Sequence, residues 1–375
     1  MNIFLKIYRK INILINNPLL SFDNLLDSKY YKFHKLILKI FLLLINFYLL
    51  LFKLTKYNLL ISSYKNYDYR KIIKFYPLFF FQIKTYYCQY YESFNNYYYF
   101  RNLLLNKLLE DPQIQSQPLK IFSIEQELYC DKVSKNLVLN QKKILEYYLK
   151  IQSKTNIKIL ENIFKNKKVL IFGPSNISNK IDFTKYDLIC LLNNNPHKLY
   201  KEFKDNIGFD MKKIILFVNI AYFIRNKGIL NKYKINKVLI KPPNKGDFIN
   251  FLTPSKILLN NYGPMGIQNV VYTVLLGRAS NIFITGVTAY LGEQIYRGNI
   301  KSYDENRQHF SNNLRRHEPY SNFAFIKNLL DLRLIDGDTK FLEIFKQSIK
   351  DYSLALDKNY EKLTYDLIFS DFRSL

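Results

Sequence analysis

The stretch KKVLIFGPSN, residues 167–176, decides the fold class of this chain. Two lysines precede four apolar residues, and a Gly-Pro-Ser turn follows them at once. A short apolar run that ends in turn residues is typical of a strand buried on both faces, as in a parallel sheet. We therefore predict a buried strand here that ends at Gly173 and leads into a loop.

Four later stretches repeat this pattern of an apolar run followed by small or amide residues. They are DLICLLNNN (187–195), KKIILFVN (212–219), NKVLIKPP (236–243) and NIFITG (281–286). Helical stretches lie between several of them, most clearly over residues 266–277. Strands that alternate with helices predict an α/β domain with a mostly parallel sheet, which we place at residues 166–350. Ligands bind such sheets beyond the carboxyl ends of the strands, where these small and amide residues lie.

The remainder of the chain divides by composition into three parts. The chain has 375 residues, of which 48% are hydrophobic, enough for one large domain or two ordinary ones. Residues 1–118 are expected to form a helical, membrane-proximal region, residues 119–165 a helical lead-in and residues 351–375 a C-terminal tail. Residues 111–118, DPQIQSQP, combine proline with polar residues, which is typical of a linker.

Residues 36–54 are the most apolar part of the N-terminal region. Thirteen uncharged residues lie between Lys39 and Lys53, whereas a helix that spans a bilayer needs about 20 apolar residues. Further lysines flank the segment at Lys35 and Lys56. Basic flanks around an apolar helix suit an anionic membrane surface, and we expect this region to dock on the cytoplasmic face of the inner membrane. A buried core helix and a true span are the two other interpretations that fit.

Composition argues against several classes of function. The formal net charge is +26, but lysine, asparagine, isoleucine and tyrosine are all abundant, as AT-rich codons would make them, so we expect no nucleic-acid partner. The cysteines Cys88, Cys130 and Cys190 lie far apart and form no CxxC pair, which argues against a disulfide framework or a zinc site. The N-terminal residues carry charges throughout and no small-residue cleavage site, so we expect no signal peptide.

Several motifs in the second half of the chain carry candidate chemistry. Six arginines fall between residues 278 and 333, and a guanidinium offers phosphate or carboxylate a forked pair of hydrogen bonds. The stretch YGPMGIQNVVYTVLLG (262–277) predicts a turn that opens a helix with an anion-binding N-terminus, or else an ordinary packing helix. His317, just before a predicted helix, is a candidate general base or else a surface histidine. We expect no metal site, because the carboxylate pair of DGD (336–338) falls in a turn.

The order and spacing of these motifs resemble the bacterial CMP-sialic acid sialyltransferases, glycosyltransferase family 42, and relatives that use CMP-activated nonulosonic acids. The matching features are Gly173-Pro174-Ser175 after the first strand, Asp187, Cys190 and Asn193 around the second, Gly266 and Gly277 at the ends of a helix, Thr285-Gly286 after the fifth strand, Tyr290 and Tyr296 in the next loop, and His317 with Asn322 before a helix. The resemblance covers roughly residues 166–345, about half of the chain. The chain departs from the family pattern at Phe172, Met265 and Thr288, where the family has asparagine, serine and aspartate.

The resemblance implies a Rossmann-like, mostly parallel sheet of the sialyltransferase type, a GT-A variant, with a helical N-terminal extension. It implies metal-independent, inverting transfer of sialic acid or a related acidic sugar from a CMP donor to a cell-surface glycan such as lipooligosaccharide or capsule, without a cofactor. Tyr290 and Tyr296 would donate hydrogen bonds to the phosphate of departing CMP, on which charge builds, and His317 would take the proton of the acceptor hydroxyl. The residues implied to bind the substrates are Gly173, Pro174, Ser175, Asn193, Gly266, Gly286 and Arg297.

A second hypothesis is a basic, membrane-associated binding or scaffold protein whose Rossmann-like domain has no catalytic activity. Convergence of Tyr290, Tyr296 and His317 on one cleft would favour the enzyme, and their dispersal the scaffold. The partners expected for the enzyme are a CMP-sugar donor, a glycan or glycolipid acceptor and a membrane surface. The sequence leaves open the sugar, the linkage and the oligomeric state.

Overall fold

The computed structural model describes residues 93–117, 154–173, 181–192, 196–218, 237–240, 266–291 and 319–359, together with Ser175 and a few isolated positions. By its internal contacts the chain divides into two compact units, residues 1–128 and residues 129–375. Most of the apolar segment 36–54 lies outside the described residues, as do most of residues 1–92 and 129–153.

The described part of the first unit is mainly the long helix α8 (Phe94–Leu109) and the short helix α9 (Pro112–Gln115). The Ser93 side chain caps α8 by accepting a hydrogen bond from the Asn96 N–H at 3.1 Å. The linker predicted at residues 111–118 contains helix α9 because Asp111 accepts from the Gln113 N–H at 2.9 Å and Pro112 stands at the first helical position. Among the described residues, no helix combines the length and apolar content that a membrane crossing requires.

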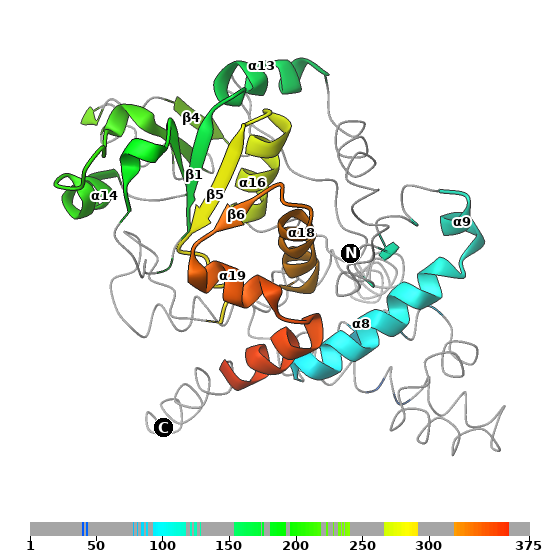
Figure 1. Cartoon of the computed structure of the whole chain (residues 1–375). Helices are drawn as coiled ribbons and strands as arrows, with labels where there is room; N and C mark the ends of the chain where they lie inside the picture. Colours follow the sequence, from blue (N-terminus) through cyan, green and yellow to red (C-terminus); the bar gives the residue numbers. More distant parts are fainter. Residues whose placement is uncertain are drawn as a thin grey trace, which may run out of the picture. The chain divides into compact units, whose positions relative to one another are not determined.

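The second unit is built on a six-stranded sheet in the order β4-β3-β2-β1-β5-β6 (Figure 1). Its strands are β1 (Lys168–Phe172), β2 (Leu188–Leu192), β3 (Ile214–Val218), β4 (Lys237–Ile240), β5 (Asn281–Thr285) and β6 (Asp336–Gly337). Every neighbouring pair is parallel. The sheet confirms the α/β class and the five strands that the apolar runs predict. The two-residue strand β6 was missed, because its residues read as a turn.

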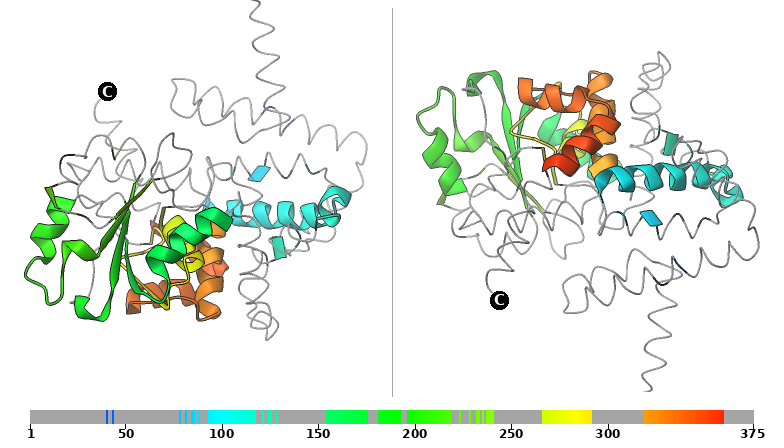
Figure 2. Two further views of the ribbon diagram at one scale, coloured as in Figure 1. Left: turned by 90° about the horizontal axis from the view of Figure 1, so that it is seen from above. Right: turned by 90° about the horizontal axis from the view of Figure 1, so that it is seen from below.

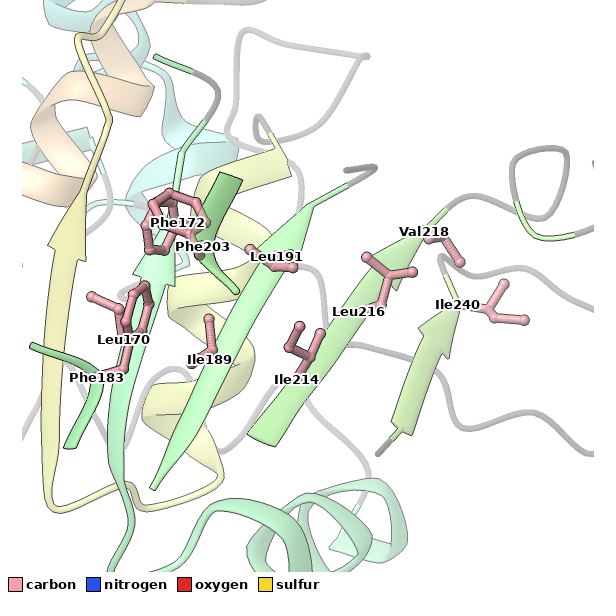
Figure 3. Close-up of a cluster of buried hydrophobic side chains, with 10 residues drawn as sticks. All are labelled: Leu170, Phe172, Phe183, Ile189, Leu191, Phe203, Ile214, Leu216, Val218 and Ile240. Carbon is pink, nitrogen blue, oxygen red and sulfur yellow. The ribbon is translucent and has the colours of Figure 1, made fainter. Parts of the chain in front are cut away.

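One face of the sheet carries a continuous core of alternate strand residues (Figure 3). This first core consists of Leu170, Phe172, Phe183, Ile189, Leu191, Phe203, Ile214, Leu216, Val218 and Ile240. The rings of Phe183, from the 3-10 helix η2 (Phe183–Lys185), and Phe203, from α14 (Pro196–Phe203), lie 6.3 and 5.4 Å from the ring of Phe172. Phe172 is only 1% exposed, so it belongs to this core and not to the loop that follows.

The opposite face is covered chiefly by α16 (Gly266–Leu276), which packs against β1, β2 and β5 and lies behind the sheet in Figure 3. This helix confirms the one predicted over residues 266–277. Its flanks contact α13 (Lys154–Phe164) and α18 (Pro319–Asp331), and α18 in turn contacts α19 (Thr339–Lys346) (Figure 2). Residues 349–359 form a further helical stretch. In the part of the unit that the structure describes, helical residues therefore lie over both faces of the parallel sheet.

Candidate active site

The strand order of the sheet reverses between β1 and β5. The chain adds β2, β3 and β4 on one side of β1 and then returns to add β5 and β6 on the other. In open parallel sheets the ligand crevice forms at such a switch point, outside the carboxyl ends of the two strands, because their loops leave toward opposite faces. Phe172 pairs with Thr285 in register, so β1 and β5 end level and the loops after them begin side by side.

Hydrogen bonds join the loops that follow β1 and β5. The Gly173 N–H donates to the Thr285 carbonyl at 2.8 Å, and the Ser175 N–H donates to the Gly286 carbonyl at 2.9 Å. The hydroxyls of Ser175 and Thr288 are also bonded, with 3.0 Å between their oxygens, and both side chains are buried. The described residues at the start of the two loops are therefore bonded to each other at the switch point.

The two glycines allow this approach of backbone to backbone. A Cβ at Gly173 would lie 2.2 Å from the carbonyl oxygen of Gly286, far inside contact distance. Gly286 has a φ of +67°, and a Cβ there would lie 2.9 Å from the Ser175 carbonyl oxygen. Only residues without a side chain fit at both positions, so the two loops meet backbone to backbone.

The DGD motif of residues 336–338 supports this floor from the β6 side. One carboxylate oxygen of Asp338 accepts hydrogen bonds from the Thr285 hydroxyl at 2.6 Å and from the Gly286 N–H at 3.3 Å. The other oxygen accepts from the Phe341 N–H at 2.8 Å and so caps α19. Asp338 thus connects the end of β5 to the start of a helix. Within the described ranges, no group of three His, Cys, Asp or Glu side chains is placed to hold a metal ion.

Tyr290 stands on the same loop, two residues beyond Thr288, and is only 4% exposed. Ala289 and Tyr290 both have left-handed backbone, with φ values of 45° and 65°. The Leu291 N–H donates to the Thr288 carbonyl at 2.8 Å and closes a turn around them. The structure therefore brings Tyr290 onto the loop that carries Gly286 and Thr288, next to the switch point.

The N-terminus of α16 lies at the end of β2. A Cβ at Gly266 would lie 1.9 Å from a methyl carbon of Leu192, the last residue of β2, so this glycine lets the helix begin against the strand. The first turn of α16 also buries the amide side chains of Gln268 and Asn269, each 2% exposed. The sequence did not single out these two amides, because apolar residues dominate the rest of the helix.

The predicted site residues divide into those described and those that are not. Gly173, Ser175, Gly286 and Tyr290 lie on the two joined loops, and Gly266 lies at the start of α16. The remaining predicted residues lie outside the described ones; these are Pro174, Asn193, Tyr296, Arg297 and His317. Sequence reasoning missed the roles of Asp338, Tyr352 and Asn359, all three of which bond to residues 285–290.

Two departures from the family pattern now have a structural account. Phe172, where the family has asparagine, faces the core with Phe183 and Phe203 and offers no polar atom to a ligand. Thr288, where the family has aspartate, bonds its hydroxyl to that of Ser175. Phe172 thus packs at the end of β1, and Thr288 connects the loop after β5 to the loop after β1.

Cys190 of β2 is excluded as a nucleophile by its surroundings. Burial in the core raises the pKa of its thiol well above the ordinary value, so the thiol keeps its proton at neutral pH.

Comparisons with protein-family models, with curated proteins and with solved structures find no match to this chain.

Proposed function

We propose that this protein is a glycosyltransferase that moves sialic acid or a related acidic sugar from a CMP-activated donor to a cell-surface glycan, such as lipooligosaccharide or capsule. The observation that carries the proposal is the pair of joined loops at the switch point. There Gly173 and Ser175 meet Gly286 and Thr288, and Tyr290 follows on the same loop. This order of residues is the one that resembles family 42, and the switch point is where an α/β sheet binds ligands.

The proposed reaction is an inverting displacement at the anomeric carbon of the donor sugar. An oxygen of the acceptor forms the new bond, and CMP leaves with the electron pair of the old one. His317 accepts the proton of the attacking hydroxyl as general base. Tyr290 and Tyr296 donate hydrogen bonds to the leaving phosphate, where neutral donors stabilise the charge as it develops.

Three features support a donor site at this edge of the sheet. The loops after β1 and β5 meet backbone to backbone at Gly173 and Gly286, at the switch point where α/β sheets bind ligands. The first turn of α16 directs its N–H groups toward the carboxyl edge, as helix N-termini that bind phosphate do. Arg297 follows Tyr296 directly in the sequence, and its guanidinium suits phosphate or the carboxylate of an acidic sugar.

Release of CMP tests the proposal. Purified protein is incubated separately with CMP-sialic acid, CMP-Kdo and CMP-pseudaminic acid, with and without a glycan acceptor, and free CMP is quantified by chromatography. We expect acceptor-dependent release from one of these donors that persists in EDTA. Tyr290→Phe is expected to lower kcat by about 10²-fold with little change in the KM for the donor, because it removes a hydrogen bond that strengthens in the transition state. Absence of release from every donor would contradict the proposal.

The membrane part of the proposal rests on the N-terminal segment. Ile40 and Leu43 are helical and 45% and 67% exposed, and residues three apart lie on the same side of a helix. Exposed apolar side chains with basic flanks suit the cytoplasmic face of the inner membrane. Co-sedimentation of the full chain with anionic vesicles, but not with neutral ones, is the expected result. An unbound protein in both cases would contradict this part alone.

The second candidate function is binding without catalysis, on the same domain. It is favoured by Phe172 and Thr288, which stand where the family has polar residues. The Phe172 side chain packs in the core, and the Thr288 hydroxyl is bonded to that of Ser175. Calorimetric titration measures whether the protein binds CMP, as both candidate functions require. Binding of CMP without release from any donor would favour this second candidate.

A further inference from the structure

The loop after β5 holds two consecutive residues in an unfavourable backbone conformation. Ala289 and Tyr290 have φ values of 45° and 65°. Left-handed backbone is disfavoured for residues with a side chain, since Cβ crowds the neighbouring carbonyl oxygen, and a bulky residue there is an outlier. Such conformations persist only where the surroundings hold them, and they gather at functional sites.

The C-terminal helical stretch, residues 349–359, supplies hydrogen bonds that hold both residues. The Tyr352 hydroxyl donates to the Ala289 carbonyl at 2.9 Å. The Asn359 side-chain amide donates to the Tyr290 carbonyl at 2.6 Å. Tyr352 and Asn359 are seven residues apart, about two helical turns, so they lie on one side of the helix and reach consecutive carbonyls.

Packing fixes the position of the Tyr352 hydroxyl. The Tyr352 side chain is fully buried, and its ring stacks on that of Phe323 in α18 with 4.2 Å between centroids and 17° between planes. The ring of Tyr320 meets it edge-on, with 6.1 Å between centroids. A phenol held on two sides has little freedom, so its hydroxyl fixes the carbonyl that it bonds.

The other end of the same turn is bonded to the loop after β1. Thr288 is tied to Ser175 through their hydroxyls, at 3.0 Å, and its carbonyl accepts from the Leu291 N–H at 2.8 Å. Tyr290 therefore lies between an anchor on the β1 loop and an anchor on the C-terminal helix. Both anchors bond residues of the turn that contains it.

We propose that Tyr352 and Asn359 are positioning residues, which hold the strained turn at Ala289 and Tyr290 so that Tyr290 is presented to the leaving phosphate. The inference rests on the proposed function, because that function gives Tyr290 its ligand. Neither residue touches the reacting atoms. Each acts through the backbone of the turn, and a donor misplaced by about 1 Å can lower a rate by about 10²-fold.

Two variants and one matched control test the proposal. Tyr352→Phe keeps the stacked ring and removes only the hydroxyl, and Asn359→Asp keeps the size of the side chain and removes its donors. The control is Tyr320→Phe, because the Tyr320 hydroxyl is also buried but donates to Ser353, at 3.0 Å, and not to the turn. We expect each of the two variants to lower kcat by about 10-fold or more, with the KM for the CMP donor within about 2-fold of wild type. The control is expected to change neither value by more than about 2-fold.

A double variant separates positioning from a general loss of structure. If Tyr352 acts through Tyr290, then Tyr352→Phe lowers kcat in the wild-type protein but adds less than about 2-fold in a protein that already carries Tyr290→Phe. The proposal is overturned if the loss is equal in the two backgrounds. It is also overturned if Tyr320→Phe causes the same loss as Tyr352→Phe, or if both positioning variants keep wild-type kcat.

Hydrogen exchange distinguishes failure of this inference from failure of the proposed function. The amides of residues 288–291 are followed by mass spectrometry in the folded protein without ligand. We expect faster exchange there in Tyr352→Phe and Asn359→Asp than in wild type or Tyr320→Phe. If the wild type releases no CMP while this contrast holds, the proposed function fails and the two residues still hold the turn. Equal exchange in all four proteins overturns the inference whatever the activity.

Discussion

Replacement of Gly173 by alanine tests the closest contact in the candidate site. The new Cβ would lie 2.2 Å from the Gly286 carbonyl oxygen and 2.5 Å from a methyl carbon of Val287. Ordinary van der Waals contact begins at about 3.4 Å, so the atoms must separate by about an ångström. The nearest atom is backbone and cannot turn aside as a side chain would. The loops after β1 and β5 must therefore move apart.

The cost follows from that separation. Overpacking a rigid site costs about 1–3 kcal/mol. Moving the loops apart also weakens the hydrogen bonds from the Gly173 and Ser175 N–H groups, each worth about 1 kcal/mol. The smaller conformational entropy of an unfolded chain with alanine returns at most about 1 kcal/mol. We therefore expect Gly173→Ala to lower the free energy of unfolding by about 2–4 kcal/mol.

Thermal unfolding followed by circular dichroism measures this change. For a unit of this size, each kcal/mol shifts Tm by about 2–4 °C, so Gly173→Ala is expected to lower Tm by about 5–15 °C. The control is Gly228→Ala, because Gly228 is helical and a Cβ there meets nothing within 4 Å. That control is expected to be neutral or to raise stability by up to about 1 kcal/mol. Equal Tm values for Gly173→Ala and wild type would refute the packing of the two loops.

Three further predictions follow from single residues. Phe172→Asn is expected to lower stability by about 3–5 kcal/mol in the same assay, because it removes a ring from the first core and buries an amide; a wild-type Tm would contradict that packing. The Cys190 thiol is expected to resist iodoacetamide at pH 8 in the folded protein and to react in urea. Burial raises the pKa of this thiol in the folded protein, so the unfolded chain loses the proton at a lower pH. The free energy of unfolding is therefore expected to fall as the pH rises above about 8.5, and Cys190→Ala should lessen that fall. His317→Gln is expected to lower kcat by about 10²–10⁴-fold and to abolish the loss of activity at acid pH, whereas Tyr296→Phe should retain that loss; an active His317→Gln enzyme with an unchanged pH profile would place the base elsewhere.

The strands and the helix α16 could be predicted because their signal is local. Apolar runs of four or five residues, ended by glycine or asparagine, mark buried parallel strands without reference to the rest of the chain. Strand β6 carries no such signal, since its two residues pair with Phe283 and Ile284 about fifty positions earlier. Its existence depends on the fold and not on its own composition.

The candidate site was predictable only in part, for a similar reason. The spacing of Gly173, Gly286 and Tyr290 marked the two loops, but spacing could not show that their backbones are bonded to each other. Phe172 could have been assigned to the core from its alternation with Leu170, because residues two apart in a strand lie on the same face. The roles of Tyr352 and Asn359 could not be predicted, since their acceptors are backbone carbonyls more than sixty residues away, and any residue type supplies those.

A crystal structure of the protein with an unreactive fluorinated CMP-sugar would show where the donor binds. We expect the nucleotide at the carboxyl edge of the sheet between β1 and β5, with its phosphate within hydrogen-bonding distance of the Tyr290 hydroxyl and its sugar facing His317. A ligand bound elsewhere on the protein, or no bound ligand at millimolar concentrations of the analogue, would contradict this prediction.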